Sequence, residues 1–576
     1  MRLLHSASLE LHNFNDNEIP PYAILSHCWG RDEISYQDMQ MYQLETSSPC
    51  GESSIRRKLG FQKIESSAKL AFEQGFDYIW IDNCCIDKTS SAELSESINS
   101  MYRWYQESIV CFAFLADVQG LEDKSDLVRR SSAFHNSRWF RRGWTLQELV
   151  APSRVDFYTG EWTFIGSKRD DDMLPLLSDI TGIEEGVLKG RLLPEDVSIA
   201  GRMGWAANRC TTKTEDIAYC LMGIFDVNMP LLYGEGKKAF IRLQEEILKG
   251  SDDQSIFAWA APQSEHATSE DVSGLLSSSP AWFKEVPSYR LLPPLPTGGS
   301  MPWNVTNLGL CVQLFLRPRR NNSGRVLLDE FEAIMACSTG IEHQDYSPRI
   351  WLRRLWGDQF ARVSPESCDL IRFNLQDQDQ TEGSYTTIFV KAKPTLFLPE
   401  FKVAPENTQA TSTDAERFVL VDVEPKSMWD DLTGILKLSQ PVLGRPAAVF
   451  RFQNTIFQDK LLDVAIGVKR SHAHDRWRPW VKQLPAKSKR PLADFLSDPE
   501  FIQLAGTLFH TPNIESTSDV ARFPQQDEDT SMPFTIAKVE EIYQRSRKYF
   551  SLRVIIKPEI FVYTKYMPKG DVMEVG

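Results

Sequence analysis

The sequence lacks the patterns that mark several large classes of protein. It contains no G-x-x-x-x-G-K-[ST] motif, so it has no P-loop for nucleotide hydrolysis. Its basic residues form no long block and its net charge is −14, which argues against nucleic acid as a partner. No window approaches about 18 continuous apolar residues, and the first residues hold no apolar run of signal-peptide length. We therefore expect a cytoplasmic protein that binds neither membrane nor nucleic acid.

Cysteine is present, but in no pattern that marks a cross-link or a metal site. None of the ten cysteines stands in a C-x-x-C pair, and several lie in apolar stretches. Such spacing predicts neither a zinc knuckle nor a disulfide framework, and it is typical of buried thiols in a reducing compartment. The run 472–475, HAHD, offers metal-ligating side chains, but it lies in a polar loop. We expect no bound metal.

The composition and the apolar pattern predict several folded parts. At 576 residues the chain is too long for one hydrophobic core, and its 42% hydrophobic and 25% charged residues are those of ordinary globular protein. Short apolar runs at 22–30, 77–87 and 109–118 predict buried strands. Apolar residues recur at helical spacing over 54–74 and 94–105. This alternation predicts an α/β fold, with a doubly wound parallel sheet at the N-terminus.

Polar and aromatic residues stand at the exits of the predicted strands. Ser26, Trp29 and Gly30 end the first strand, and Asp82 and Asp87 end the second. In doubly wound sheets ligands bind at the carboxyl ends of the strands, so these five residues are candidates for a binding site. The alternative is that the two aspartates cap the following helix or turn, and that the tryptophan belongs to the core.

The stretch 136–152, NSRWFRRGWTLQELVAP, holds a carboxylate among aromatic and basic side chains. Glu148 follows Trp144 by four residues, so on a helix the two share a face and the indole forms an apolar wall beside the carboxylate. Such a wall shifts a pKa, which makes Glu148 our candidate for catalysis and Trp144 part of the same pocket. Arg142 is a candidate for holding an anionic part of a ligand. Alternatively, Glu148 forms a structural ion pair with Arg142 or Arg141.

The rest of the chain divides into a helical part and a β-rich part. Apolar residues recur at three and four positions within 200–250, which predicts helices packed on the sheet domain. The run 263–274 is almost wholly polar, as is typical of a linker. Eight short alternating runs follow and predict an antiparallel, sandwich-like domain. The parts that we expect are a sheet domain, its helical extension, a linker and a β-rich C-terminal domain, at 1–165, 166–261, 262–281 and 282–576.

Three segments together resemble a known family. The similarity is to the heterokaryon-incompatibility (HET) domain of filamentous fungi, and it covers roughly residues 20–165. The segments that carry it are LSHCWG, YIWIDNCCIDK and RGWTLQEL followed by AP. Residues 202–247 resemble the helical extension that often follows such a domain. The resemblance implies a protein of incompatibility and self/non-self recognition, which triggers programmed cell death in response to a protein partner or trigger that the sequence does not identify.

A more distant resemblance is to the TIR domain. The matching residues are, in order, Leu25-Ser26, Glu93-Leu94-Ser95, Ser108-Ile109-Val110, and Trp144, Glu148 and Leu149. Enzymatic TIR domains cleave NAD through a glutamate in the last motif. The resemblance therefore implies that Glu148 cleaves the nicotinamide–ribose bond of NAD, which is then a substrate and not a cofactor. It also implies that Arg141 or Arg142 pairs with the pyrophosphate, that Trp29 or Trp144 stacks on a ring, and that the N-terminal domain forms a homo-oligomer.

Three interpretations remain open. The N-terminal domain is this NAD-cleaving enzyme, a non-enzymatic signalling module whose surfaces recruit partners, or a degenerate and inactive relative. A nucleophilic pair of His27 and Cys28 is another chemistry, but neighbours in a strand point to opposite faces.

Overall fold

The computed structural model describes most of the first 394 residues and the strands beyond them. The described residues are 1–46, 53–120, 127, 129–262, 272–291, 302–320, 326–341, 344–356, 358–372, 383–392, 394, 400–403, 418–426, 429–430, 435–437, 448–454, 461–471, 476–483, 491–492, 534–544 and 547–557. They fall into two compact units, Met1–Pro394 and Thr395–Gly576.

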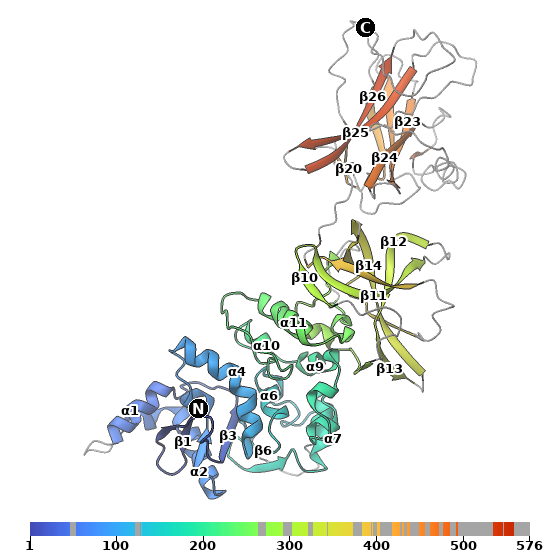
Figure 1. The fold of residues 1–576 in the computed structure, drawn as a ribbon. Helices are drawn as coiled ribbons and strands as arrows, with labels where there is room; N and C mark the ends of the chain where they lie inside the picture. The colour runs from blue at the N-terminus through green and yellow to red at the C-terminus, as the bar shows by residue number, and fades with distance from the viewer. Residues whose placement is uncertain are drawn as a thin grey trace. The chain divides into compact units, whose positions relative to one another are not determined.

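The first unit begins with a seven-stranded mixed sheet (Figure 1). Its strands are β1 (Arg2–His5), β2 (Leu11–Asn13), β3 (Tyr22–His27), β4 (Tyr78–Trp80), β5 (Val110–Leu115), β6 (Val155–Thr159) and β7 (Phe164–Ser167). Four parallel strands form the centre in the order β4-β3-β5-β6. Antiparallel partners flank them, with β1 and β2 on one side and β7 on the other. The α/β class is confirmed, with a parallel centre inside a mixed sheet.

The parallel strands follow from their sequences. β3, β5 and β6 are buried along their whole length, as expected for strands covered on both faces. The strands predicted at 22–30 and 109–118 are confirmed. The strand predicted at 77–87 is shorter than expected, because Asp82 already begins the short helix α3 (Asp82–Cys85).

Helices connect the parallel strands. They are α1 (Tyr36–Thr46), η1 (Ser54–Arg57) and α2 (Leu59–Glu73) between β3 and β4, α4 (Ser91–Glu107) before β5, and η2 (Arg138–Arg141) and α6 (Thr145–Val150) before β6. The helices predicted over 54–74 and 94–105 are confirmed. α4 begins where Ser90 accepts a hydrogen bond from the amide of Glu93, and α2 ends before Gly75, whose φ is +83°.

The strand order creates a switch point between β3 and β5. After β3 the chain moves outward to β4 and then returns to the other side of β3 to form β5. Connections that leave in opposite directions open a crevice at the carboxyl ends of these two strands. Ser26 and His27 end β3 at this switch point, and both are buried.

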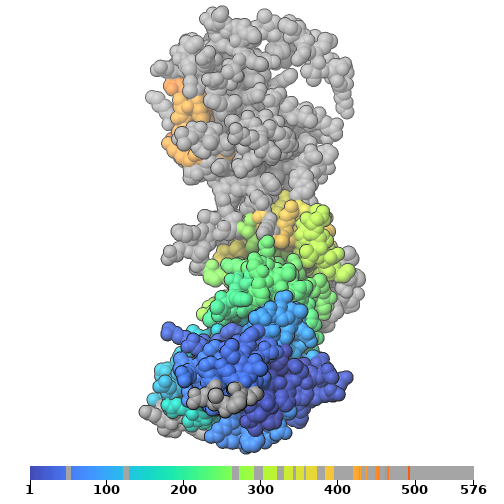
Figure 2. All heavy atoms as spheres, turned by 90° about the vertical axis from the view of Figure 1, so that its left-hand side faces the viewer, coloured from blue at the N-terminus to red at the C-terminus, as the bar shows by residue number. Residues whose placement is uncertain are grey.

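A helical extension packs on the sheet domain. Its elements are α7 (Met173–Thr181), α8 (Glu185–Leu188), η3 (Pro194–Asp196), α9 (Ile199–Ala206), α10 (Asp216–Tyr219), α11 (Lys238–Gly250) and η4 (Gln254–Phe257). Figure 2 shows the later part of this extension, in green, lying directly against the N-terminal domain in blue. The packing is close, since a Cβ on Gly223 would lie 2.1 Å from the Cβ of Tyr102.

The first unit also contains a ten-stranded sheet. Its strands are β8 (Val272–Ser273), β9 (Arg290–Leu291), β10 (Asn304–Thr306), β11 (Gly309–Arg320), β12 (Val326–Ile334), β13 (Cys337–Ile341), β14 (Gln344–Trp356), β15 (Gln359–Val363), β16 (Asp369–Arg372) and β17 (Ser384–Val390), and η5 (Pro280–Phe283) precedes β9. Of the expected linker at 262–281, residues 263–271 lie outside the described residues, and β8 pairs with β15. The expected boundaries at 165, 261 and 281 lie inside this unit and stay predictions.

The second unit holds two further sheets, which confirms a β-rich C-terminal region. One has the order β20-β21-β18-β26-β25 and the other β19-β22-β23-β24. These strands are β18 (Glu400–Val403), β19 (Phe418–Glu424), β20 (Trp429–Asp430), β21 (Ile435–Lys437), β22 (Ala448–Asn454), β23 (Leu461–Ser471), β24 (Arg476–Gln483), β25 (Phe534–Gln544) and β26 (Arg547–Lys557). The HAHD run at 472–475 lies outside the described residues.

Three features of the described residues bear on the expectations from composition. The nine cysteines among them are all free. Cys84, Cys85, Cys111 and Cys220 are buried, as predicted, whereas Cys28, for which the apolar stretch 22–30 predicts burial, is half-buried. No helix within the described ranges is long and apolar enough to cross a membrane. In the same part of the chain, no cluster of three or more His, Cys, Asp or Glu side chains is arranged to hold a metal ion.

One buried arginine joins the extension to the ten-stranded sheet. Arg362, on β15, is fully buried and donates to the carbonyl oxygens of Phe257 at 3.0 Å and of Trp259. It donates also to the carbonyl of Ser367, and its guanidinium lies 3.6 Å from the centre of the Trp259 ring. These bonds satisfy carbonyl oxygens that have no access to water.

We expect Arg362→Met to destabilise the first unit by about 3 kcal/mol, because it leaves several buried carbonyls without a donor. Urea unfolding followed by tryptophan fluorescence measures the loss. The matched control is Arg290→Met, which removes an exposed arginine paired with Asp345 and should change the unfolding curve little. Equal effects of the two changes would contradict the structural role of Arg362.

Candidate functional site

Glu148 lies in the interior, in contact with the end of β3. It is only 7% exposed, and the Ser26 hydroxyl donates a hydrogen bond to its Oε2. Ser26 in turn accepts a hydrogen bond of 2.8 Å from the indole Nε1 of Trp139. The structure therefore brings together Ser26 and Glu148, which the sequence placed in one site, and adds an indole donor behind them.

The surroundings of Glu148 change its acidity. Burial raises the pKa of Glu148 to about 8, and the negative charge of Asp82 adds to the rise. The hydrogen bond from Ser26 and the positive charges of Arg142 and Arg209 oppose it. At pH 7 most of this carboxyl is therefore protonated. Its neighbour Tyr105 also has a pKa well above its usual value, through burial and the proximity of Glu148.

A second polar cluster lies on the other face of β3. Asp82 Oδ1 is 3.0 Å from Nε2 of His27, and Asp82 Oδ2 accepts a hydrogen bond of 2.9 Å from the indole of Trp29. The ammonium of Lys88 lies 3.7 Å from Asp82 Oδ2 and 3.6 Å from the centre of the Trp29 ring. Because Ser26 and His27 are adjacent in a strand, they project to opposite faces of the sheet. The candidate residues thus form two clusters.

The charges in this second cluster stabilise one another. Burial alone would raise the pKa of Asp82, but the charge of Lys88 and the hydrogen bonds from His27 and Trp29 hold it well below its usual range. Burial lowers the pKa of His27, so its ring is neutral at pH 7. A neutral ring that donates from Nε2 to a carboxylate leaves Nδ1 as an acceptor, and this Nδ1 has no hydrogen-bond partner.

The other candidates have separate partners. The indole N–H of Trp144 donates to Asp216 of the extension at 3.4 Å. Asp87 accepts hydrogen bonds from the amide and hydroxyl of Thr89, which is the turn-capping arrangement. The amide of Gly30 donates to Glu33 at 2.6 Å. Arg142 is half-buried, and its charge acts on Glu148.

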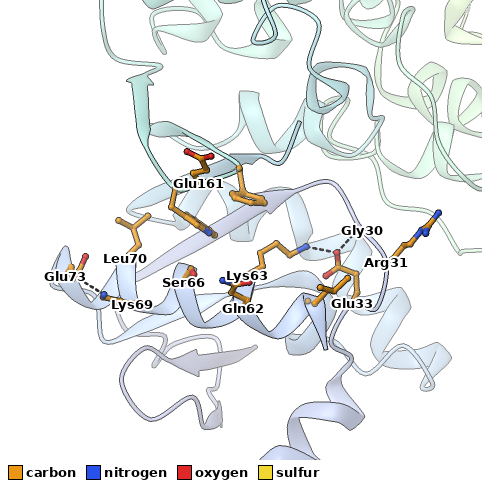
Figure 3. A pocket seen from close by; sticks show the side chains of 15 residues that line it. Gly30, Arg31, Glu33, Gln62, Lys63, Ser66, Lys69, Leu70, Glu73 and Glu161 are labelled. Carbon is orange, nitrogen blue, oxygen red and sulfur yellow. Dashed lines mark hydrogen bonds and ion pairs between the residues drawn. The ribbon is translucent and has the colours of Figure 1, made fainter. Parts of the chain in front are cut away.

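An open groove of about 770 Å³ runs along α2 at the carboxyl ends of β3, β5 and β6. Figure 3 shows Lys63 directed towards Glu33 and Gly30 at one end, and Lys69 beside Glu73 at the other. Aromatic residues form part of the wall, where Phe114 and Trp162 stack with ring centres 4.5 Å apart. Glu148 does not line this groove.

Arg209 is a residue near the site that sequence reasoning missed. It is buried beneath the start of α6 and donates to Thr145 Oγ1 at 3.0 Å. The two residues are 64 positions apart, so no local spacing reveals the contact. The one available signal was the arginine itself, inside a segment otherwise rich in apolar residues.

The comparisons with known proteins agree with this α/β domain. Residues 22–135 match the family model of the heterokaryon incompatibility protein (HET), and residues 238–288 match a domain of unknown function, DUF8212. This part of the chain therefore matches the HET domain. Glu148 lies beyond the matched residues.

A particular relative is the vegetative incompatibility protein HET-E-1 of Podospora anserina. The chain is 46% identical to it over 242 residues, which are 41% of this chain and 16% of that protein. The chain thus spans about a sixth of the length of the curated relative that it matches. No solved structure matches the chain.

We expect Glu148→Gln to become stabilising relative to the wild type as the pH rises. Because the pKa of Glu148 is raised from 4.5 to about 8, folding favours the protonated carboxyl. Its contribution is fully present below about pH 4.5 and is lost as the pH rises through about 8. Glutamine does not titrate, so the thermal midpoint of the variant minus that of the wild type should increase between about pH 5 and pH 9.

The control for this measurement is Glu65→Gln, which changes an exposed glutamate on α2. Its difference from the wild type should stay constant over the same range. A constant difference for Glu148→Gln as well would show that the buried carboxyl does not carry a raised pKa.

Proposed function

We propose that this chain acts in an incompatibility response and that its HET domain cleaves the nicotinamide–ribose bond of NAD, with Glu148 as the catalytic carboxylate. The first part is supported by the 46% identity to a protein named for vegetative incompatibility. The second is carried by one observation, the carboxyl of Glu148 buried at the end of β3 beside the switch point of the sheet. A carboxyl with a strongly shifted pKa at such a crevice is a candidate functional group.

The proposal includes a TIR-like, doubly wound fold for the HET domain. Its support is the order of the parallel strands, β4-β3-β5-β6, which is the start of the order 2-1-3-4-5. It includes also self-association through this domain, as the resemblance to TIR domains implies. No nucleic acid or membrane takes part in this function.

In this reaction the bond from nicotinamide to the ribose carbon breaks, and its electron pair leaves with the nicotinamide ring. Positive charge then develops on the ribose, and an ionised Glu148 stabilises it. Water adds to the ribose carbon and releases a proton to solvent. Nicotinamide is already a good leaving group, so no general acid is needed. The positively charged nicotinamide ring also favours ionisation of Glu148, against the effect of burial.

The groups around Glu148 have roles in the proposal. Arg142 lies close enough for its charge to act on the carboxyl, and it pairs with the pyrophosphate. Trp29 belongs to the cluster with Asp82 on the other face of β3, but it is 47% exposed just beyond the end of that strand, and in the proposal it stacks on a ring of the substrate. Because Glu148 itself is almost fully buried, the proposal requires that a segment covering it moves when the substrate binds.

The second candidate function is a non-enzymatic signalling module. It is favoured by the completeness of the network at Glu148, in which a protonated carboxyl bonds Ser26 and rests behind Trp139. Such a carboxyl stabilises a fold without any chemistry. In this function Glu148 joins β3 to α6, and partners bind elsewhere on the surface.

We expect the purified full-length chain, at high protein concentration and about pH 8, to release nicotinamide from NAD. Glu148→Gln should reduce the rate at least about 100-fold, since it removes the charge that stabilises the transition state. Glu65→Gln should keep the full rate, and circular dichroism shows that each variant is folded. If the folded wild type releases no nicotinamide, the signalling module is the correct function.

A further inference from the structure

Two pairs of hydrogen bonds, joined through the backbone and side chain of Trp139, link the helical extension to Glu148. Arg209 donates to Thr145 Oγ1 at 3.0 Å. The Thr145 hydroxyl is bonded to the carbonyl oxygen of Trp139. The Trp139 indole donates to Ser26 at 2.8 Å, and Ser26 donates to Glu148. The arginine of the extension is therefore one end of a network whose other end is the candidate catalytic carboxyl.

The backbone before α6 is built on the same segment of the extension. The amide of Cys210 donates to the carbonyl of Arg141 at 2.7 Å, and the amide of Gly143 donates to the carbonyl of Cys210 at 2.9 Å. Arg209 adds a bond of 2.9 Å to the carbonyl of Arg142. A Cβ on Gly143 would lie 2.5 Å from Cγ2 of Thr211, so no larger residue fits between the two segments.

The charge of Arg209 is held in the interior close to Glu148. Arg209 is 7% exposed, and its Nη2 has no hydrogen-bond partner. Burial lowers the pKa of Arg209 to about 10, and the nearby Cys220 and Glu148 act against this decrease. A buried guanidinium with an unpaired N–H destabilises the fold, unless its charge stabilises the ionised form of a nearby acid. The charge of Arg209 acts on Cys220 and on Glu148, and in both it favours the ionised form.

We propose that Arg209 is a positioning residue for Glu148, so that the helical extension is part of the candidate active site. Arg209 holds the start of α6 in place and stabilises the ionised form of the carboxyl from behind. The proposal rests on the proposed function, because it concerns the same carboxyl. It predicts that removing residues 205–211 from the HET domain raises the pKa of Glu148 and shifts its position.

The test uses the full-length chain and two matched arginines of the extension. Arg209→Gln removes the positioning charge. Arg202→Gln is the control, since Arg202 is also buried but donates to the carbonyl of Ile224 and stacks on Phe225. Each variant is made with and without Glu148→Gln, and the thermal midpoints of each pair are compared across pH. The pH at which the difference between the two midpoints stops increasing reports the pKa of Glu148 in the folded state.

We expect this pH to rise by about one unit in Arg209→Gln and to stay unchanged in Arg202→Gln. Arg209→Lys, which keeps the positive charge, should restore most of the wild-type value. All other titratable or charged groups that interact with Glu148 are the same in every variant, namely Cys28, Asp82, Tyr105, Cys111, Arg142 and Cys220. An unchanged value in folded Arg209→Gln would overturn the proposal.

Nicotinamide release provides a second measurement on the same variants. In Arg209→Gln the increase of kcat with pH should occur about one unit higher than in the wild type, with a smaller change in KM. If no variant releases nicotinamide but the stability measurement still shifts, Arg209 positions Glu148 and the proposed NAD cleavage is what fails. If Arg209→Gln does not fold, Thr145→Val replaces it. This change removes the hydroxyl that Arg209 bonds, with the same expected direction and the same overturning result.

Discussion

Burial of one carboxyl group is the constraint on which the N-terminal domain depends. The side chain of Glu148 has almost no access to bulk water, so its oxygens need donors from the protein. Ser26 supplies one from the first parallel strand, and this bond joins two segments 122 residues apart. Trp139 fixes the orientation of the Ser26 hydroxyl. The position of α6 against the sheet is therefore specified by polar contacts as well as by apolar packing.

The end of β3 serves two sites, because its side chains alternate between the faces of the sheet. Ser26 faces α6 and bonds Glu148, whereas His27 faces the cluster formed with Asp82. The segment LSHCWG thus contributes to both faces within a few residues. This explains why residues that are close in the sequence do not form one pocket. It also explains how the domain keeps an ionised aspartate and a protonated glutamate on opposite faces of one strand.

The HET domain depends on segments that lie later in the chain. The approach to α6 is bonded to the segment around Arg209, and Tyr102 of α4 leaves room only for a glycine at position 223. Further on, Arg362 of the ten-stranded sheet donates to carbonyls at the end of the extension. Successive polar contacts of this kind join the sheet domain, the extension and the first β-rich sheet within one compact unit.

The sequence by itself determined the strands at 22–27 and 110–115, the helices α2 and α4, the α/β class and the similarity to HET domains. These follow from local apolar periodicity and from short motifs, which act over a few residues. It also singled out Glu148, because a carboxylate among aromatic residues is unusual. Only the tertiary structure decided that Trp144 bonds Asp216, that Ser26 is the partner of Glu148, and that Arg209 lies behind it. Those contacts join residues 64 to 122 positions apart, and no spacing in the sequence records which distant side chains meet in the core.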